Sequence, residues 1–152
     1  MKPEETIDFQ LRKAWFNISK MYNAEAARYK GTMSVGFVLL SIDVKEGTPS
    51  TKLGPKMGME PGSLSRILKS LEEDGLIVRK TDSKDKRSVR VYLTPKGIEK
   101  RDIARKTVIT FNKIVRSKIS AKKLDVFFEV LENINSIIEK KEIYKENIPV
   151  ES

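Results

Sequence analysis

The chain contains no cysteine and no histidine among its 152 residues. It therefore has no disulfide, no thiol sensor, no thiol nucleophile and no His-ligated zinc site. General acid–base chemistry would fall to carboxylates or lysines, because no imidazole is available. The sequence also lacks a glycine-rich phosphate loop and paired carboxylates in an apolar setting. We expect no enzymatic activity, no bound metal and no cofactor.

Long apolar runs are missing as well. The best candidate, VGFVLLSIDV, is about ten residues long and is followed by Lys45, whereas a membrane helix needs roughly 20 apolar residues. The amino-terminal MKPEETIDFQ has no apolar core and no cleavage-like site. These features predict a cytoplasmic protein with no membrane partner.

Positive charge, in contrast, is abundant and unevenly distributed. The chain has 30 Lys and Arg against 21 Asp and Glu, a net charge of +9. Residues 79–90, RKTDSKDKRSVR, contain six basic and two acidic side chains. A basic protein in general needs only a solvated surface, but charge gathered on one predicted hairpin favours a polyanionic partner, nucleic acid before membrane.

Apolar residues at three- and four-residue spacing predict several helices. They lie at residues 7–29, 34–44, 95–118 and 120–141. Thr94 and Ser120 are the expected N-caps of the last two, with Pro95 in the first turn. Residues 47–51, GTPST, are typical of a loop.

The central segment predicts a helix-turn-helix followed by a β-hairpin. A short helical piece around residues 52–57 precedes a turn and a second helix, PGSLSRILKSLEEDG, which ends at Gly75. Residues 77–81 and 88–93 then alternate as strands. The predicted fold is mainly α with a small two-stranded β-wing (α+β), a winged helix-turn-helix flanked by N- and C-terminal dimerisation helices.

A winged helix places its second helix in the major groove of double-stranded DNA. Arg66 has the one guanidinium there that can form a fork onto guanine. The hairpin tip would lie over the minor groove, with Asp85 holding the guanidinium of Arg87 extended. The candidate DNA-binding residues are Pro61, Gly62, Ser63, Ser65, Arg66, Lys69, Ser70, Lys84, Asp85, Lys86 and Arg87.

The run LSRILKSLEEDGLIVRKTDSKDKRSVRVYLTPKG resembles the multiple antibiotic resistance regulator (MarR) family of winged-helix transcription factors, and the resemblance covers nearly the whole chain. It implies that Asp85 and Arg87 are the wing pair at the minor groove. Two features depart from the family pattern. Lys84 and Ser70 stand where members often carry Arg, and Pro55 falls inside the first helix of the motif, where it predicts a short or bent helix.

The outer helices carry more apolar surface than a lone winged helix can cover. Packing within one bundle is one explanation, and a two-fold homodimer with interlocked termini, which the resemblance also implies, is the one we favour. We expect residues 1–31 and 118–152 to be dimerisation helices, and residues 32–117 to be the winged helix-turn-helix with its connecting long helix. Such a dimer predicts a pseudo-palindromic operator.

The expected function is sequence-specific transcriptional regulation, with repression as the favoured outcome, by a nucleoid-associated protein. A sequence-indifferent or architectural DNA-binding protein, or a winged helix that binds protein, is the alternative. The resemblance also implies a small aromatic or anionic effector between the dimer helices and the winged helix. Candidate effector residues are Trp15, Tyr22, Arg28, Tyr29 and Phe37, with Lys30 as a second cation.

Overall fold

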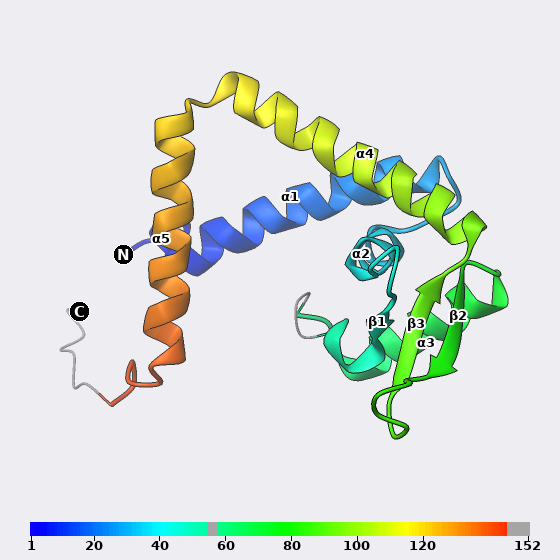
Figure 1. Ribbon diagram of the computed structural model, residues 1–152. Helices are drawn as coiled ribbons and strands as arrows, with labels where there is room; N and C mark the ends of the chain where they lie inside the picture. The colour runs from blue at the N-terminus through cyan, green and yellow to red at the C-terminus, as the bar shows by residue number, and fades with distance from the viewer. Residues whose placement is uncertain (55–57, 146–152) are drawn as a thin grey trace. The chain divides into compact units, whose positions relative to one another are not determined.

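The computed structural model describes residues 1–54 and 58–145 (Figure 1). Two compact units divide the chain between Ile109 and Thr110, inside the long helix α4. The elements in chain order are η1 (Pro3–Glu5), α1 (Ile7–Ala27), α2 (Met33–Ser41), β1 (Thr48–Pro49), η2 (Ser50–Lys52), α3 (Pro61–Glu73), β2 (Ile77–Thr81), β3 (Val89–Leu93), α4 (Pro95–Lys118) and α5 (Ala121–Glu139).

Helix α2 is shorter than its apolar pattern predicts. The pattern continues to Val44, but the helix ends at Ser41 and Ile42 is extended. The carboxylate of Asp43 accepts hydrogen bonds from the backbone N–H groups of Lys45 and Glu46. This local side-chain turn competes with the helical bonds, which is why the helix stops early.

Helix α3 has the bounds that the sequence predicts. Pro61 occupies its first turn, and Gly75 follows it in the left-handed conformation at φ 72°. The N–H of Leu76 donates to the carbonyl of Leu71 at 2.9 Å, which closes the helix end. The predicted helical piece at 52–57 overlaps only the last residue of the 3-10 helix η2, and Pro55 lies outside the described residues.

Three strands form an antiparallel sheet in the order β1-β3-β2. The two-stranded wing is confirmed, with Ile77 opposite Leu93 and Thr81 opposite Val89. The loop prediction for residues 47–51 is wrong at its centre, because Thr48 and Pro49 pair with β3. A two-residue strand containing proline carries no period-two signal, so no sequence pattern predicts this edge strand.

The core lies between α2, α3 and the sheet. Its buried residues come from these elements and from residues next to an element's end: Val38, Leu39, Ile42, Leu53, Leu64, Leu68, Leu71, Leu76, Ile77 and Val91. The predicted caps are confirmed, since Thr94 Oγ1 accepts from Gly97 N and Ser120 Oγ accepts from Lys123 N. None of the helices in the described part of the chain combines the length and apolarity that crossing a bilayer requires.

Candidate nucleic-acid interface

Helix α3 turns one face into the core and leaves the other polar and accessible. Leu64, Leu68 and Leu71 are buried. The predicted DNA-binding residues lie opposite this stripe, and all are exposed except Ser63, which is half-buried; they are Pro61, Gly62, Ser63, Ser65, Arg66, Lys69 and Ser70. Because leucines hold the helix, its outer face is presented in one orientation.

Two details of this outer face bear on recognition. Arg66 Nη2 lies 3.4 Å from Ser63 Oγ, so the guanidinium is drawn toward the first turn of the helix. A Cβ added at Gly62 would meet no atom within 4 Å. Packing within the protein therefore does not require glycine at position 62. Glycine would be required there if another molecule approached the backbone closely.

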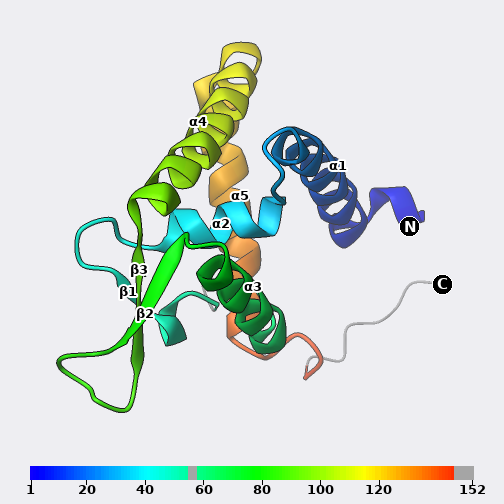
Figure 2. The same ribbon diagram turned by 90° about the vertical axis from the view of Figure 1, so that its right-hand side faces the viewer.

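The hairpin loop between β2 and β3 extends away from α2 and α3 in both views (Figures 1 and 2). Its residues 83–87 are all exposed, so no apolar side chain anchors it. Asp82, at the base, is buried and organises the loop instead. Its Oδ1 accepts from the N–H groups of Lys84 at 2.8 Å and Asp85 at 3.4 Å. These two bonds shape the start of the loop.

A second side of the same carboxylate faces a cation. Arg90 Nε lies 3.1 Å from Asp82 Oδ2, and the side chains of the pair are only 22% and 6% exposed. The N–H of Lys84, first, and the guanidinium of Arg90 hold the pKa of Asp82 below its ordinary value. Asp82 therefore remains ionised at neutral pH, as a buried and paired carboxylate must.

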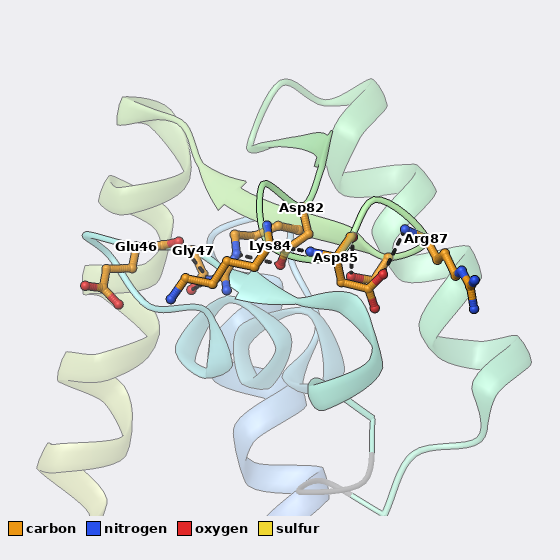
Figure 3. Close-up of polar contacts among 8 residues, drawn as sticks. Glu46, Gly47, Asp82, Lys84, Asp85 and Arg87 are labelled. Atoms are coloured by element: carbon orange, nitrogen blue, oxygen red, sulfur yellow. Dashed lines mark hydrogen bonds and ion pairs between the residues drawn. The ribbon is translucent and has the colours of Figure 1, made fainter.

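The predicted contact between Asp85 and the Arg87 guanidinium is not formed in this structure. The Asp85 carboxylate accepts from the backbone N–H of Arg87 at 3.0 Å, and Figure 3 shows the Arg87 side chain extending away from it. A short Asp side chain readily reaches the backbone N–H two residues later, so the Asp85 carboxylate bonds this N–H instead of the Arg87 guanidinium. Asp85 thus shapes the turn, and Arg87 has no ion-pair partner among the described residues.

Part of the positive charge in residues 79–90 is used inside the protein. Arg79 forms a two-pronged salt bridge with Glu72 on α3, with both N–O distances 3.1 Å. Glu72 thus neutralises one cation of the wing, although its side chain remains 43% exposed. Lys80 lies over the ring of Tyr92, 5.8 Å from its centroid. The cations left to face a partner are Lys84, Lys86 and Arg87 at the tip.

Sequence reasoning missed the roles of Asp82 and Arg90. Arg90 was counted only as one of the wing's charges, although it pairs with Asp82 across the hairpin. The register supplies a signal that was available. With Thr81 opposite Val89, Asp82 follows β2 opposite Ser88, and Arg90 lies two residues further along β3, at the diagonal position that a long side chain can reach.

A cavity of about 80 Å³ lies among α1, α2 and the first half of α4, within the first unit. Tyr22, Tyr29 and Phe37 line it, as expected of candidate effector residues. Trp15 is not in the lining but stacks on Phe37 at 6.4 Å between ring centroids. Arg28 forms a salt bridge with Glu25. The structure therefore brings together three of the five candidates.

The cavity is almost wholly apolar, with one cation at its edge that the sequence did not indicate. Lys100, on α4, donates from Nζ to the carbonyl of Tyr29 at 3.1 Å. Burial raises the pKa of the Tyr22 phenol, so Tyr22 is neutral at physiological pH. Lys100 is 71 residues from Tyr29 in sequence, and helical periodicity alone does not reveal such a distant pairing.

Helix α3 with its leucine face in the core and its polar face exposed, followed by a basic β-hairpin, defines a winged helix-turn-helix protein. The family model of the MarR family matches residues 32–89. The chain is also 28% identical over 130 residues to the HTH-type transcriptional regulator SarZ of Staphylococcus aureus, a match that covers 85% of this chain and 84% of SarZ. The chain is thus similar to transcriptional regulators of the MarR family, most clearly over residues 32–89.

Solved structures agree in fold. The transcriptional repressor CouR bound to a 23-mer DNA duplex is 25% identical, with a TM-score of 0.74, covering 87% of this chain and 94% of CouR. The PcaV transcriptional regulator of Streptomyces coelicolor, in complex with its natural ligand, has a TM-score of 0.76 at 16% identity and covers 90% and 96% of the two chains. The latter likeness establishes the fold alone.

Proposed function

We propose that the chain regulates transcription as a homodimer bound to a pseudo-palindromic DNA operator, with repression as the outcome. The carrying observation is that one compact unit presents both an exposed polar helix face and an exposed cationic tip. The likeness to the regulator SarZ and to CouR, a repressor solved on DNA, supports the proposal.

Helix α3 is the reading element of this proposal. The major groove of B-DNA, about 12 Å wide, admits a helix whose outer face is free of bulky apolar groups. Ser65 and Gly62 permit close approach, and Arg66 supplies a guanidinium that can donate two parallel bonds to guanine O6 and N7. Lys69 and Ser70, one turn further along, reach the phosphate backbone.

The wing tip is the second contact. Arg87 is exposed and has no ion-pair partner among the described residues, and Lys84 and Lys86 flank it on the same loop. A narrow A·T-rich minor groove has enhanced negative potential and attracts an inserted arginine. The wing therefore contributes affinity, salt dependence and a preference for groove shape, whereas α3 contributes base identity.

Exposed apolar side chains on the outer helices support the dimer. On α1, Ile7, Trp15 and Phe16 are more than half exposed, and on α5 so are Val126 and Ile137. Apolar surface of this extent marks an interaction site. In our proposal residues 1–31 and 118–152 bury it against a second copy, and the two α3 helices then face half-sites about one helical turn apart.

Fluorescence anisotropy tests the proposal. It would compare the duplex upstream of the gene encoding this chain with a scrambled duplex of equal composition, at about 50 mM and 200 mM salt. We expect a preference of about 10³-fold or more for the natural duplex. Equal and salt-sensitive binding to both duplexes would indicate an architectural DNA-binding protein. Absence of binding to either would leave a protein partner for the wing.

The cavity among α1, α2 and α4 supports a second element, release by a small effector. An apolar lining with a lysine at the edge suits a small aromatic molecule that carries an anionic group. The cavity volume of about 80 Å³ is smaller than the roughly 150 Å³ of an engineered cavity that binds benzene. Binding of an aromatic molecule must therefore widen the cavity. That widening would displace α2, which packs against α3, and so weaken DNA binding.

Calorimetry with simple aromatic carboxylates tests the effector directly. We expect saturable binding that is weakened in Lys100→Met, and a matching release of DNA in the anisotropy experiment. Arg28→Met serves as the control, because Arg28 pairs with Glu25 and is not in the cavity lining. Titrations without saturable heat would contradict the effector proposal and leave the DNA proposal standing.

A further inference from the structure

Arg90 makes contacts that neither strand pairing nor DNA binding requires. It lies on the central strand β3, opposite Lys80 on one side and Pro49 on the other. Its Nε contacts the Asp82 carboxylate, and its Nη1 donates to the carbonyl oxygens of Glu46 at 3.1 Å and Gly47 at 3.2 Å. One guanidinium thus joins the base of the wing loop to a loop more than 40 residues earlier in the chain.

The loop that Arg90 contacts is itself held by hydrogen bonds. The Asp43 carboxylate accepts from two backbone N–H groups, and Gly47 N donates to the carbonyl of Asp43. Gly47 has φ 67°, and a Cβ there would meet the Tyr92 ring at 2.6 Å. The two carbonyls that accept from Arg90 are therefore held in place, and they give the guanidinium a firm attachment point.

The wing loop has no comparable support of its own. All its tip residues are exposed, and the hydrogen bonds that shape it involve Asp82, Asp85 and Ser88. Asp82 is 5% exposed. A buried carboxylate without a cation is costly, and it escapes the cost by moving toward water or taking up a proton. Loss of Arg90 would therefore release Asp82 and, with it, the N–H groups of Lys84 and Asp85.

We propose that Arg90 is a positioning residue for DNA binding, which holds the wing tip in place so that Arg87 can enter the minor groove. This inference rests on the proposed function. Arg90 is not itself a phosphate contact, because Nε and Nη1 are engaged within the protein and its side chain is only 22% exposed. Arginine suits the role because its planar fork donates in several fixed directions at once, which lysine cannot do.

A double-mutant cycle with Arg87 separates positioning from general stability. DNA affinity would be measured by anisotropy at one salt concentration for wild type, Arg90→Met, Arg87→Ala and the double variant. Methionine keeps an unbranched apolar stem and removes every donor. We expect Arg90→Met to weaken binding roughly tenfold, about 1.4 kcal/mol, in the wild-type background and less than about twofold when Arg87 is absent. An equal loss in both backgrounds would overturn the proposal.

Two further measurements test the role of Arg90 independently of the double-mutant cycle. Amide hydrogen exchange at Lys84 and Asp85 should accelerate in Arg90→Met, while exchange in α3 stays unchanged. Arg90→Lys should keep the ion pair with Asp82 but not both carbonyl contacts. Its DNA affinity should therefore fall between those of wild type and Arg90→Met. If Arg87→Ala binds DNA like wild type, the proposed minor-groove contact is wrong. Unchanged exchange at Lys84 and Asp85 in Arg90→Met would separately overturn the positioning role.

Should Arg90→Met fail to fold, Arg90→Lys and Asp82→Asn replace it in the cycle. Asp82→Asn removes the negative charge and keeps the size of the side chain. The matched control is Lys80→Met on the neighbouring strand, because Lys80 faces Arg90 in the register but contacts the Tyr92 ring instead of the loop. We expect Lys80→Met to leave exchange at Lys84 and Asp85 unchanged. Faster exchange there in the control would count against a specific role for Arg90.

Discussion

Helix α3 and the wing loop are the two surfaces that we propose to meet DNA, and they are held in opposite ways. Buried leucines fix α3, and its outer face carries few charges. The wing loop has no apolar anchor and is held by one buried carboxylate, Asp82, with Arg90 behind it. Apolar packing therefore positions the element that we propose reads bases, whereas a polar network positions the element that we propose supplies charge.

This difference predicts that damage to α3 is global and damage to the wing is local. Leu71 is 2% exposed in the core. We expect Leu71→Ala to lower the free energy of unfolding by about 2–5 kcal/mol, since the cavity left behind adds to the lost burial. Urea unfolding followed by circular dichroism measures it. Val78→Ala, on an exposed apolar residue of β2, is the control, and an equal loss there would contradict the placement of the core.

A smaller and more specific effect is expected at the reading face. Arg66→Ala should flatten the preference at one base position by roughly 1–3 kcal/mol, because it removes the fork onto guanine. Anisotropy with duplexes that vary each base pair in turn measures the loss. Lys69→Ala provides the contrast, since a phosphate contact should weaken binding to every duplex alike and reduce the salt slope by about 1. A uniform loss in Arg66→Ala would show that it contacts phosphate.

Gly62 offers a prediction in which stability and binding change in opposite directions. Space is open around a Cβ at this position, so Gly62→Ala should stabilise the free protein by up to about 0.5–1 kcal/mol through helix propensity. It should weaken DNA binding, because the added methyl group stands where DNA would approach. Thermal unfolding and anisotropy measure the two effects. Unchanged DNA affinity would mean that this turn of α3 does not contact DNA closely.

The contribution of Asp82 to the acid dependence of stability is the smallest expected effect and concerns the wing. Because the folded-state pKa of Asp82 is lowered, its stabilising contribution is present above the ordinary aspartate pKa of about 3.9 and is lost as pH falls through the lowered value. Asp82→Asn should therefore flatten the decline in stability below about pH 4. Unfolding curves between pH 6 and pH 3 measure it. Asp43 and Glu72, whose pKa values are also lowered, keep part of the decline in the variant.

Features that depend on local spacing could be predicted from the sequence. The apolar stripe of α3, the glycine that ends it and the caps at Thr94 and Ser120 each involve residues within a few positions of one another. The hairpin followed from period-two alternation. The family resemblance was carried by the same contiguous segment, which overlaps the matched residues 32–89.

Contacts between distant segments could not be predicted in the same way. The pairing of Arg79 with Glu72, of Arg90 with Glu46 and Gly47, and of Lys100 with Tyr29 depends on how elements pack. A charge count therefore treated Arg79 and Arg90 as free, although both are ion-paired in the fold. The early end of α2 escaped prediction because the side chain of Asp43 outcompeted a continuous apolar pattern.

The central claim is that α3 reads bases while the wing reads groove shape, and selection from a random DNA library tests it most directly. Wild type, Arg66→Ala and Arg87→Ala would each be used to enrich 30-base-pair duplexes, followed by sequencing. The account predicts two inverted half-sites about 10 base pairs apart for wild type, loss of one base preference in Arg66→Ala, and loss of an A·T-rich flank in Arg87→Ala. Enrichment of no common motif by wild type would contradict it.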